Sequence, residues 1–211
     1  MLNKAFTKFQ DKSRKKKFDL FIKILAPTKE TKILDVGCGE GTFLEDLYIF
    51  RNNITALDIS DRNIKAFKKN YPGIKIFKNN AKYMQFKAKS FDIIFSNAVI
   101  EHVGGFNEQK KYAREIRRVG RNYFITTPNK WFPFEPHYRL PLFQFVPKKI
   151  QRILANFFSL GNYPKGYWES INLISSSQLK KLFPEATIIK QKVSFLPETL
   201  IAIYNNQRNP K

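Results

Sequence analysis

The stretch ILDVGCGEGTF, residues 33–43, places three glycines directly after an apolar run and directly before a segment of helical character. The glycines are Gly37, Gly39 and Gly41. Because glycine has no Cβ, the backbone there can adopt positive φ and let a bulky ligand approach closely. The first amides of the following helix point toward such a ligand. The stretch therefore predicts a ligand-binding turn, with a plain strand-to-helix connection as the structural alternative.

The spacing of these glycines narrows the choice of ligand. The dinucleotide-binding fingerprint G-x-G-x-x-G needs glycine or alanine at position 42, where Thr42 stands. A P-loop would continue with Gly-Lys and then Ser or Thr, which this stretch lacks. Both nucleotide-phosphate motifs are therefore excluded at this turn.

Five short runs of β-branched and aromatic residues alternate with segments of helical periodicity. The runs cover residues 32–36, 53–59, 74–78, 91–96 and 122–127. Strands that alternate with helices predict an α/β fold with a doubly wound, mostly parallel sheet. Two further runs, residues 186–195 and 198–204, lie on either side of Pro197 and predict a closing antiparallel strand pair.

Helix signals occupy the intervals between the strands. Helices are expected over residues 42–51, 60–70, 108–120, 148–158 and 175–183. Ser60 and the serines at 175–177 are N-cap candidates, and Gly120 is a natural stop. A basic amphipathic helix is expected over residues 1–26, either packed on the fold or lying against phosphate or lipid head groups.

Residues 129–170 interrupt the strand–helix rhythm with a stretch dense in proline and aromatic residues. In a fold of this kind, an insertion after the fifth strand is expected to cover the substrate site. No internal repeat or second domain is evident, so residues 1–211 are predicted to form a single domain.

The chain has 211 residues and a formal net charge of +21. Such a charge attracts phosphates or anionic lipid, although the lysine-rich, Asn- and Ile-rich composition is also typical of an AT-rich genome. No apolar run is long enough to cross a bilayer and no signal-peptide core precedes the domain, which predicts a cytoplasmic protein with peripheral membrane contact as an option. One cysteine and two histidines lead us to expect no metal site.

Polar residues follow the strands at the edge where a doubly wound sheet binds its ligands. Asp58 ends the second strand, where a carboxylate can accept both ribose hydroxyls of an adenosine. Asn80 and Ala81 follow the third strand and can contact an adenine edge, while the carbonyl of Ser96, after the fourth, can face an ammonium group. One site is therefore expected from four loops.

These residues together resemble the class I S-adenosylmethionine-dependent methyltransferases, in the type 11 group. The resemblance runs from about residue 31 to 128 and includes D-x-G-x-G-x-G at 35–41, ALDIS at 56–60 and SFDIIFSNAVIEHV at 90–103. It implies a Rossmann-like sheet of seven strands and S-adenosylmethionine as cofactor. The implied cofactor residues are Asp35, Gly37, Cys38, Gly39 and Gly41 for the methionine part, with Ser96 nearby, Asp58 for the ribose, and Ile59, Asn80 and Ala81 for the adenine.

Two positions depart from the usual pattern or invite a second interpretation. Asn80 stands where an aspartate is common, which keeps an acceptor for the adenine amino group but removes a charge. Cys38 is interpreted as a small buried residue of the loop and not as a reactive thiol.

Methyl transfer is an in-line displacement in which positioning of the two reactants supplies most of the rate. An acceptor hydroxyl or protonated amine must still lose a proton. His102, just beyond the fourth strand, and His137, in the insertion, are the candidate general bases, and a purely structural role is the alternative for each. His102 is favoured by position, since His137 needs closure of the insertion to reach the reaction.

The insertion supplies the candidate substrate contacts, namely Trp131, Glu135, His137, Tyr138 and Arg139. Aromatic residues interleaved with basic ones suit an amphiphilic acceptor that carries a phosphate, or a membrane surface that holds one. The sequence therefore predicts a methyltransferase that acts on the oxygen or nitrogen of a small molecule, glycan or lipid-linked acceptor, with no protein partner expected. An RNA methyltransferase and a non-catalytic S-adenosylmethionine-binding protein are the alternatives.

Overall fold

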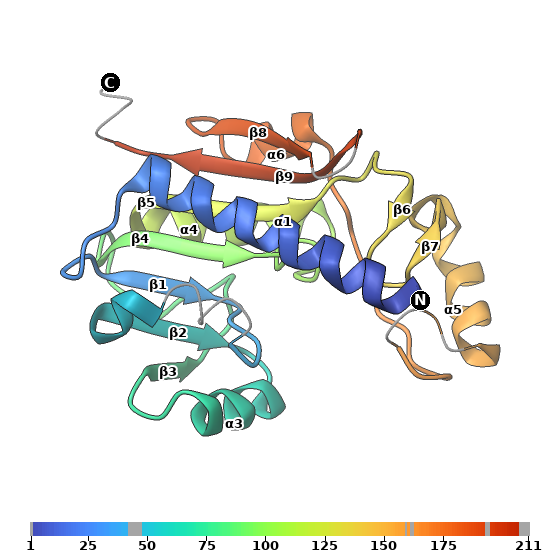
Figure 1. Ribbon diagram of the computed structural model, residues 1–211, viewed down its shortest axis with the longest axis horizontal. Helices are drawn as coiled ribbons and strands as arrows, with labels where there is room; N and C mark the ends of the chain where they lie inside the picture. Colours follow the sequence, from blue (N-terminus) through green and yellow to red (C-terminus); the bar gives the residue numbers. More distant parts are fainter. Residues whose placement is uncertain (1, 42–47, 159, 161–162, 193–194, 207–211) are drawn as a thin grey trace.

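Figure 1 presents the computed structural model of the chain, which describes residues 2–41, 48–158, 160, 163–192 and 195–206. A seven-stranded sheet has the order β3-β2-β1-β4-β5-β9-β8. The strands are β1 (Ile33–Val36), β2 (Ile54–Asp58), β3 (Lys75–Lys78), β4 (Phe91–Asn97), β5 (Gly120–Pro128), β8 (Thr187–Lys192) and β9 (Pro197–Tyr204). The first five are parallel, and β9 and β8 close the sheet as an antiparallel pair. The predicted doubly wound α/β fold is confirmed.

Helices cover both faces of the sheet (Figure 1). On one face, Phe21 of α1 (Leu2–Leu25) and Phe67 of α3 (Asp61–Asn70) pack with sheet residues such as Phe95. On the other, Tyr112 of α4 (Phe106–Val119) and Leu179 of α6 (Ser176–Leu182) pack on the opposite side chains of the same strands. Because strand side chains alternate between faces, each buried strand contributes to both cores.

The basic N-terminal helix is a packing element along much of its length. Phe21 is fully buried, with ring centroids 5.4 Å from Phe95 and 5.5 Å from Phe124. Lys12, Lys15 and Lys16 face solvent on the opposite side. No helix in the described part of the chain is long and apolar enough to span a membrane.

The predicted helix boundaries hold where a cap or a close contact sets them. Ser60 Oγ accepts from the Asn63 amide, and Ser175 forms a capping box with Gln178. Helix α4 ends at Gly120 as predicted, but through extended backbone, at φ −93°. An added Cβ there would lie 2.3 Å from Ile94 Cγ1, so close packing requires this glycine.

Two sequence expectations differ from the structure or fall outside it. Of the helix expected over residues 42–51, residues 42–47 lie outside the described residues, and the part that is described forms a 3-10 helix, η1 (Tyr48–Asn53). The run expected as a strand over 186–195 is a strand only as far as Lys192, and residues 193–194 also lie outside the described part.

The insertion is a small subdomain with its own core. It contains a hairpin of β6 (Phe134–Glu135) and β7 (Leu140–Pro141), the 3-10 helix η2 (Phe143–Phe145) and α5 (Lys148–Phe157). Its core consists of Tyr138, Phe143, Ala155, Leu160 and Ile171. The sequence predicts the helix but not the hairpin, because strands of two residues carry no periodic signal.

Candidate cofactor and acceptor site

The glycine loop after β1 has positive φ at all three glycines. A Cβ on Gly37 would lie 2.4 Å from Val99 Cγ2, and one on Gly41 would lie 2.2 Å from the Tyr71 ring, so both positions serve close packing. At Gly39 an added Cβ would meet nothing within 4 Å. The loop is therefore held tightly at both ends and presents open backbone in the middle.

Asp58, at the end of β2, connects this loop to the start of α3. Its Oδ2 accepts from the Gly39 amide at 2.9 Å, and its Oδ1 accepts from the Ser60 amide at 2.8 Å. Asn63 Nδ2 donates to the same Oδ1 at 3.3 Å. The carboxylate is thereby fixed beside the open glycine backbone.

A cavity of about 600 Å³ lies at this edge of the sheet. One wall contains predicted cofactor residues, and the other contains residues of the loop after β4 and of the 160s segment. Its lining includes Gly37, Gly39, Asp58, Ile59, Asn80, Ala81, Ala98, Val99, His102, Tyr167 and Glu169. Six of the ten residues predicted to bind the cofactor are therefore brought together around one cavity.

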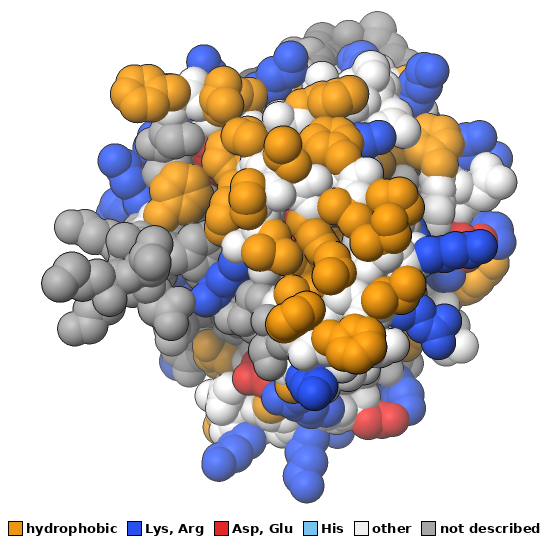
Figure 2. Space-filling model, turned by 90° about the vertical axis from the view of Figure 1, so that its right-hand side faces the viewer, with side chains coloured by type: hydrophobic (Ala, Val, Ile, Leu, Met, Phe, Trp, Pro, Cys, Tyr) orange, Lys and Arg blue, Asp and Glu red, His pale blue; other side chains and the backbone are white. Residues whose placement is uncertain are grey.

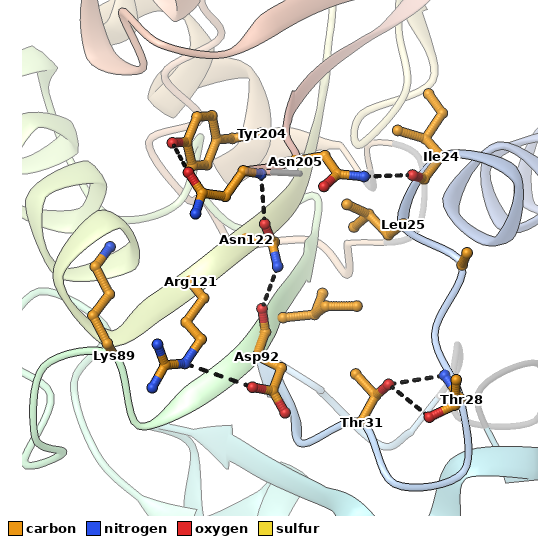
Figure 3. A pocket seen from close by; sticks show the side chains of 13 residues that line it. Ile24, Leu25, Thr28, Thr31, Lys89, Asp92, Arg121, Asn122, Tyr204 and Asn205 are labelled. Carbon is orange, nitrogen blue, oxygen red and sulfur yellow. Dashed lines mark hydrogen bonds and ion pairs between the residues drawn. The ribbon is translucent and has the colours of Figure 1, made fainter. Parts of the chain in front are cut away.

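A larger cavity of about 730 Å³ lies at the opposite edge, where the parallel strands begin (Figure 3). Its polar groups bond to one another: Arg121 Nε lies 3.6 Å from Asp92 Oδ1, and Asn122 Nδ2 donates to the Asp92 carbonyl at 3.0 Å. Doubly wound sheets bind ligands at the carboxyl ends of their strands. We therefore place the functional site at the glycine loop despite the smaller volume there.

Asn80 lies in the wall as predicted, although its side chain is already engaged. Its Oδ1 accepts from the Lys82 amide at 3.0 Å, which shapes the turn after β3. Ile59, by contrast, exposes 62% of its surface at the cavity and is free to lie against a flat ring.

The other four residues that the sequence assigned to the cofactor do not line the cavity, namely Asp35, Cys38, Gly41 and Ser96. Ser96 Oγ donates to the Val36 carbonyl and accepts from Tyr112 Oη, both at 2.8 Å. Burial raises the pKa of the Cys38 thiol, which agrees with the interpretation of a small inert residue. Burial, together with repulsion from Asp58, raises the pKa of Asp35 to about 7.

The two histidines lie side by side, and His102 belongs to the other wall of the cavity. Their ring centroids are 4.9 Å apart. His102 lines the cavity and its Nδ1 donates to Glu169 Oε1 at 2.6 Å, while His137 Nδ1 donates to Glu135 Oε1 at 2.7 Å. The insertion is packed against the loop after β4, which places His137 beside His102 but not in the lining of the cavity, so its delivery to the reaction by closure stays a prediction.

The environment of His102 is strongly acidic. Burial lowers its pKa, but the hydrogen bond to Glu169 and the carboxylates of Glu101 and Glu135 raise it more, so the pKa is raised overall. Sequence reasoning did not identify Glu101 or Glu169. The one available signal was the position of Glu101 directly before His102.

The predicted substrate contacts of the insertion need correction. Tyr138 and Glu135 are buried in the subdomain and do not line the cofactor cavity. Tyr138 Oη donates to the Glu169 carbonyl at 2.6 Å, so it positions a cavity residue. Trp131 lies on the surface against Phe145, and Arg139 is half-buried with left-handed backbone at φ 54°.

Comparison with known proteins agrees with this architecture. A family model described as a methyltransferase domain matches residues 34–123. Residues 34–123 therefore form a methyltransferase domain of the type 11 group, within a fold shared with class I S-adenosylmethionine-dependent methyltransferases. Its cofactor is S-adenosylmethionine.

The methyltransferase domain has relatives of known sequence and of known structure. An uncharacterized protein of Mycobacterium tuberculosis is 34% identical over 44% of this chain and 32% of its own length. A ubiquinone biosynthesis O-methyltransferase of Pelagibacter ubique is 29% identical over 49% of this chain and 45% of its own. The chain thus spans less than half of these relatives.

Among solved structures, a protein of Pyrococcus horikoshii has a TM-score of 0.64 at 18% identity, covering 92% of this chain and 90% of its own. The magnesium protoporphyrin IX methyltransferase of Synechocystis, solved with bound SAH, has a TM-score of 0.61 at 10% identity. The match covers 97% of this chain and 87% of that protein. Because these sequence identities are low, the similarity shows a shared fold alone.

The residues of the methyltransferase domain fit the cofactor on their own chemistry. No atom lies within 4 Å of the place where a Cβ on Gly39 would stand, so a ligand can approach the backbone there. The carboxylate of Asp58 is fixed beside this open backbone. S-adenosylmethionine carries an ammonium and a sulfonium, and two carboxylates, Asp35 and Asp58, lie close enough for their charges to repel. A cationic ligand relieves that repulsion.

We predict that Asp58→Ala weakens S-adenosylmethionine binding by about 2 to 4 kcal/mol, because it removes a charged acceptor for the ribose hydroxyls and frees the glycine loop. Isothermal titration calorimetry measures the change. Asp61→Ala is the matched control, since Asp61 lies three residues away, is exposed and pairs with Lys78. Equal affinity in the wild type and Asp58→Ala would place the cofactor elsewhere.

A second prediction concerns the stability of the ligand-free chain. Asp35 has a raised folded-state pKa of about 7. Between about pH 4 and 7 the folded chain therefore keeps a proton that the unfolded chain loses, so stability falls as the pH rises through this window. In Asp35→Asn this decline should be smaller, and the free energy of unfolding at pH 8 should be roughly 2 to 4 kcal/mol higher than in the wild type.

Urea unfolding at a series of pH values tests this, with Asp61→Asn as the control that leaves the slope unchanged. An Asp35→Asn curve that falls as steeply as the wild-type curve would show that Asp35 is ionised throughout the window.

Proposed function

We propose that the protein transfers a methyl group from S-adenosylmethionine to an oxygen or nitrogen of an amphiphilic small-molecule acceptor. The observation that carries this proposal is the composition of the cavity. One wall consists of the glycine loop and Asp58, while the other holds His102, Tyr167 and Glu169 beside the aromatic insertion. A cofactor and a second reactant can therefore meet in one cavity.

The cofactor, when bound, supplies a methyl group on a sulfonium that a nucleophilic acceptor displaces in line. The chain's own task is to hold the two partners in that line and to exclude water. Asp58 is suited to hold the ribose and the glycine loop the methionine part, and Ala98 and Val99 line the same cavity. The roles of His102 and His137 as general bases stay predictions.

The face around the cavity supports an amphiphilic acceptor. Figure 2 looks onto the end of the molecule toward which the parallel strands point, and hydrophobic side chains gather there inside a border of lysines and arginines. Much of the exposed apolar surface comes from the insertion. The exposed residues there are Trp131, Leu142, Phe145, Ile150, Ile153, Phe157, Phe158 and Tyr167.

Helix α5 has the pattern of a helix that lies on a lipid surface. Ile150, Ile153 and Phe157 follow the helical spacing of three and four residues, and all three are about half exposed or more. The sequence KKIQRILANF adds Lys149 and Arg152, which are also exposed. An apolar stripe with flanking cations suits an anionic membrane that holds the acceptor.

Names of similar proteins point in the same direction. The relatives named as ubiquinone biosynthesis O-methyltransferases and the neighbour named as a magnesium protoporphyrin IX methyltransferase modify small molecules.

Incubation with methyl-labelled S-adenosylmethionine and fractionated cell extract should place the label in material that partitions into organic solvent. Asp58→Ala should lower this incorporation by at least roughly tenfold through loss of cofactor binding. Label that enters nuclease-sensitive material would assign an RNA substrate instead, and label in neither fraction at saturating cofactor would refute methyl transfer to extractable acceptors.

Vesicle sedimentation tests the lipid surface. Ile153→Asp should weaken binding to vesicles containing phosphatidylglycerol by roughly tenfold, because it removes apolar area and adds a charge at the membrane. Asn156→Asp adds the same charge to the same helix and keeps the apolar stripe, so its effect should stay within about twofold. Equal binding by wild type and Ile153→Asp would exclude α5 as the contact.

A further inference from the structure

Three side chains meet where the insertion packs on the loop after β4. Glu101 and His102 come from that loop and His137 from the segment between β6 and β7. One ligand-type atom of each lies within 4.8 Å of the corresponding atoms of the other two. Two imidazoles and one carboxylate form a common donor set for zinc and related divalent ions.

Each of the three donors is held by a second residue. His102 Nδ1 donates to Glu169 and His137 Nδ1 donates to Glu135, while Thr127 Oγ1 donates to Glu101 Oε2 at 3.0 Å. A carboxylate on the far nitrogen of a histidine fixes the ring and leaves Nε2 as the free donor of electrons. Such supporting carboxylates are typical of the residues that orient histidines at metal sites.

The second carboxylate oxygen of Glu101, Oε1, indicates that a ligand belongs here. Glu101 is fully buried, and its Oε1 has no hydrogen-bond partner among the described residues. It lies 3.8 Å from His137 Nε2, too far for a hydrogen bond. When Nδ1 of a neutral histidine is protonated, its Nε2 carries a lone pair, so two electron-rich atoms face each other across this gap.

We propose that Glu101 Oε1, His102 and His137 bind a divalent transition-metal ion of the zinc type. Around a tetrahedral zinc ion with bonds of about 2.1 Å the ligand atoms lie about 3.4 Å apart, so modest ring rotations close the site. Magnesium and calcium prefer sets made of oxygen atoms alone, which disfavours them here. The sequence led us to expect no metal, because the spacing of Glu101, His102 and His137 along the chain gives no metal-binding motif.

Three protein ligands leave a coordination position open. Because His102 also lines the cofactor cavity, an ion held by these residues would lie at the border of the space assigned to the acceptor. The ion is suited to hold an oxygen donor of the acceptor, such as a phenol or carboxylate, beside the methyl group. This last step rests on the proposed function, whereas binding of the ion does not.

The test is isothermal titration calorimetry of untagged, chelator-treated protein with zinc chloride, and with cobalt chloride as a spectroscopic substitute. One zinc per chain should bind with a dissociation constant below about 10 µM, and magnesium should not compete. Glu101→Gln and His137→Gln should each weaken zinc binding at least about tenfold. Cys38→Ala and the surface change Glu30→Gln are controls that should leave zinc affinity unchanged.

S-adenosylmethionine affinity is measured on the same samples. Glu101 and His137 do not line the cofactor cavity, so both variants should keep this affinity, which also shows that they fold. Zinc binding that is absent in the wild type, or unchanged in both variants, would overturn the metal site. Retained zinc binding without methyl transfer would count against the proposed function alone.

Discussion

The carboxylate of Asp58 holds together the segments on which the site depends. It accepts from the backbone of Gly39 on one side and of Ser60 on the other, so the glycine loop and the start of α3 are fixed to the end of β2. Gly37 and Gly41 add close contacts to Val99 and Tyr71. Backbone freedom at three glycines is thereby converted into one rigid turn that faces a ligand.

This arrangement has an electrostatic consequence. Asp35 and Asp58 lie near each other at the carboxyl edge, and burial with their mutual repulsion raises the pKa of Asp35. Preorganised negative charge is costly in the ligand-free chain and favours a cationic cofactor. The stability of the ligand-free chain and its affinity for the cofactor therefore both depend on Asp35 and Asp58.

The insertion completes the other wall through contacts that span the chain. Tyr138 Oη donates to the Glu169 carbonyl, and the Asn172 amide donates to the Glu101 carbonyl at 2.9 Å. His137 lies next to His102 here, with Glu135 at its Nδ1 and Glu101 3.8 Å from its Nε2. The same subdomain turns the apolar stripe of α5 outward, so the acceptor wall and the proposed lipid-facing surface are built from one unit.

Sequence alone determined the sheet, because alternating strands, serine caps and the glycine turn are local signals with periods or short spacings. It also determined the cofactor wall, since Asp58, Ile59, Asn80 and Ala81 follow strands whose ends must converge. Only the tertiary structure decided that Asp35, Cys38, Gly41 and Ser96 do not line the cavity, because burial depends on what packs in front. It likewise decided the cluster of Glu101, His102, His137 and Glu169. These residues are separated by up to 68 positions in the chain and carry no shared spacing, so only the packing of the insertion on the loop after β4 brings them together.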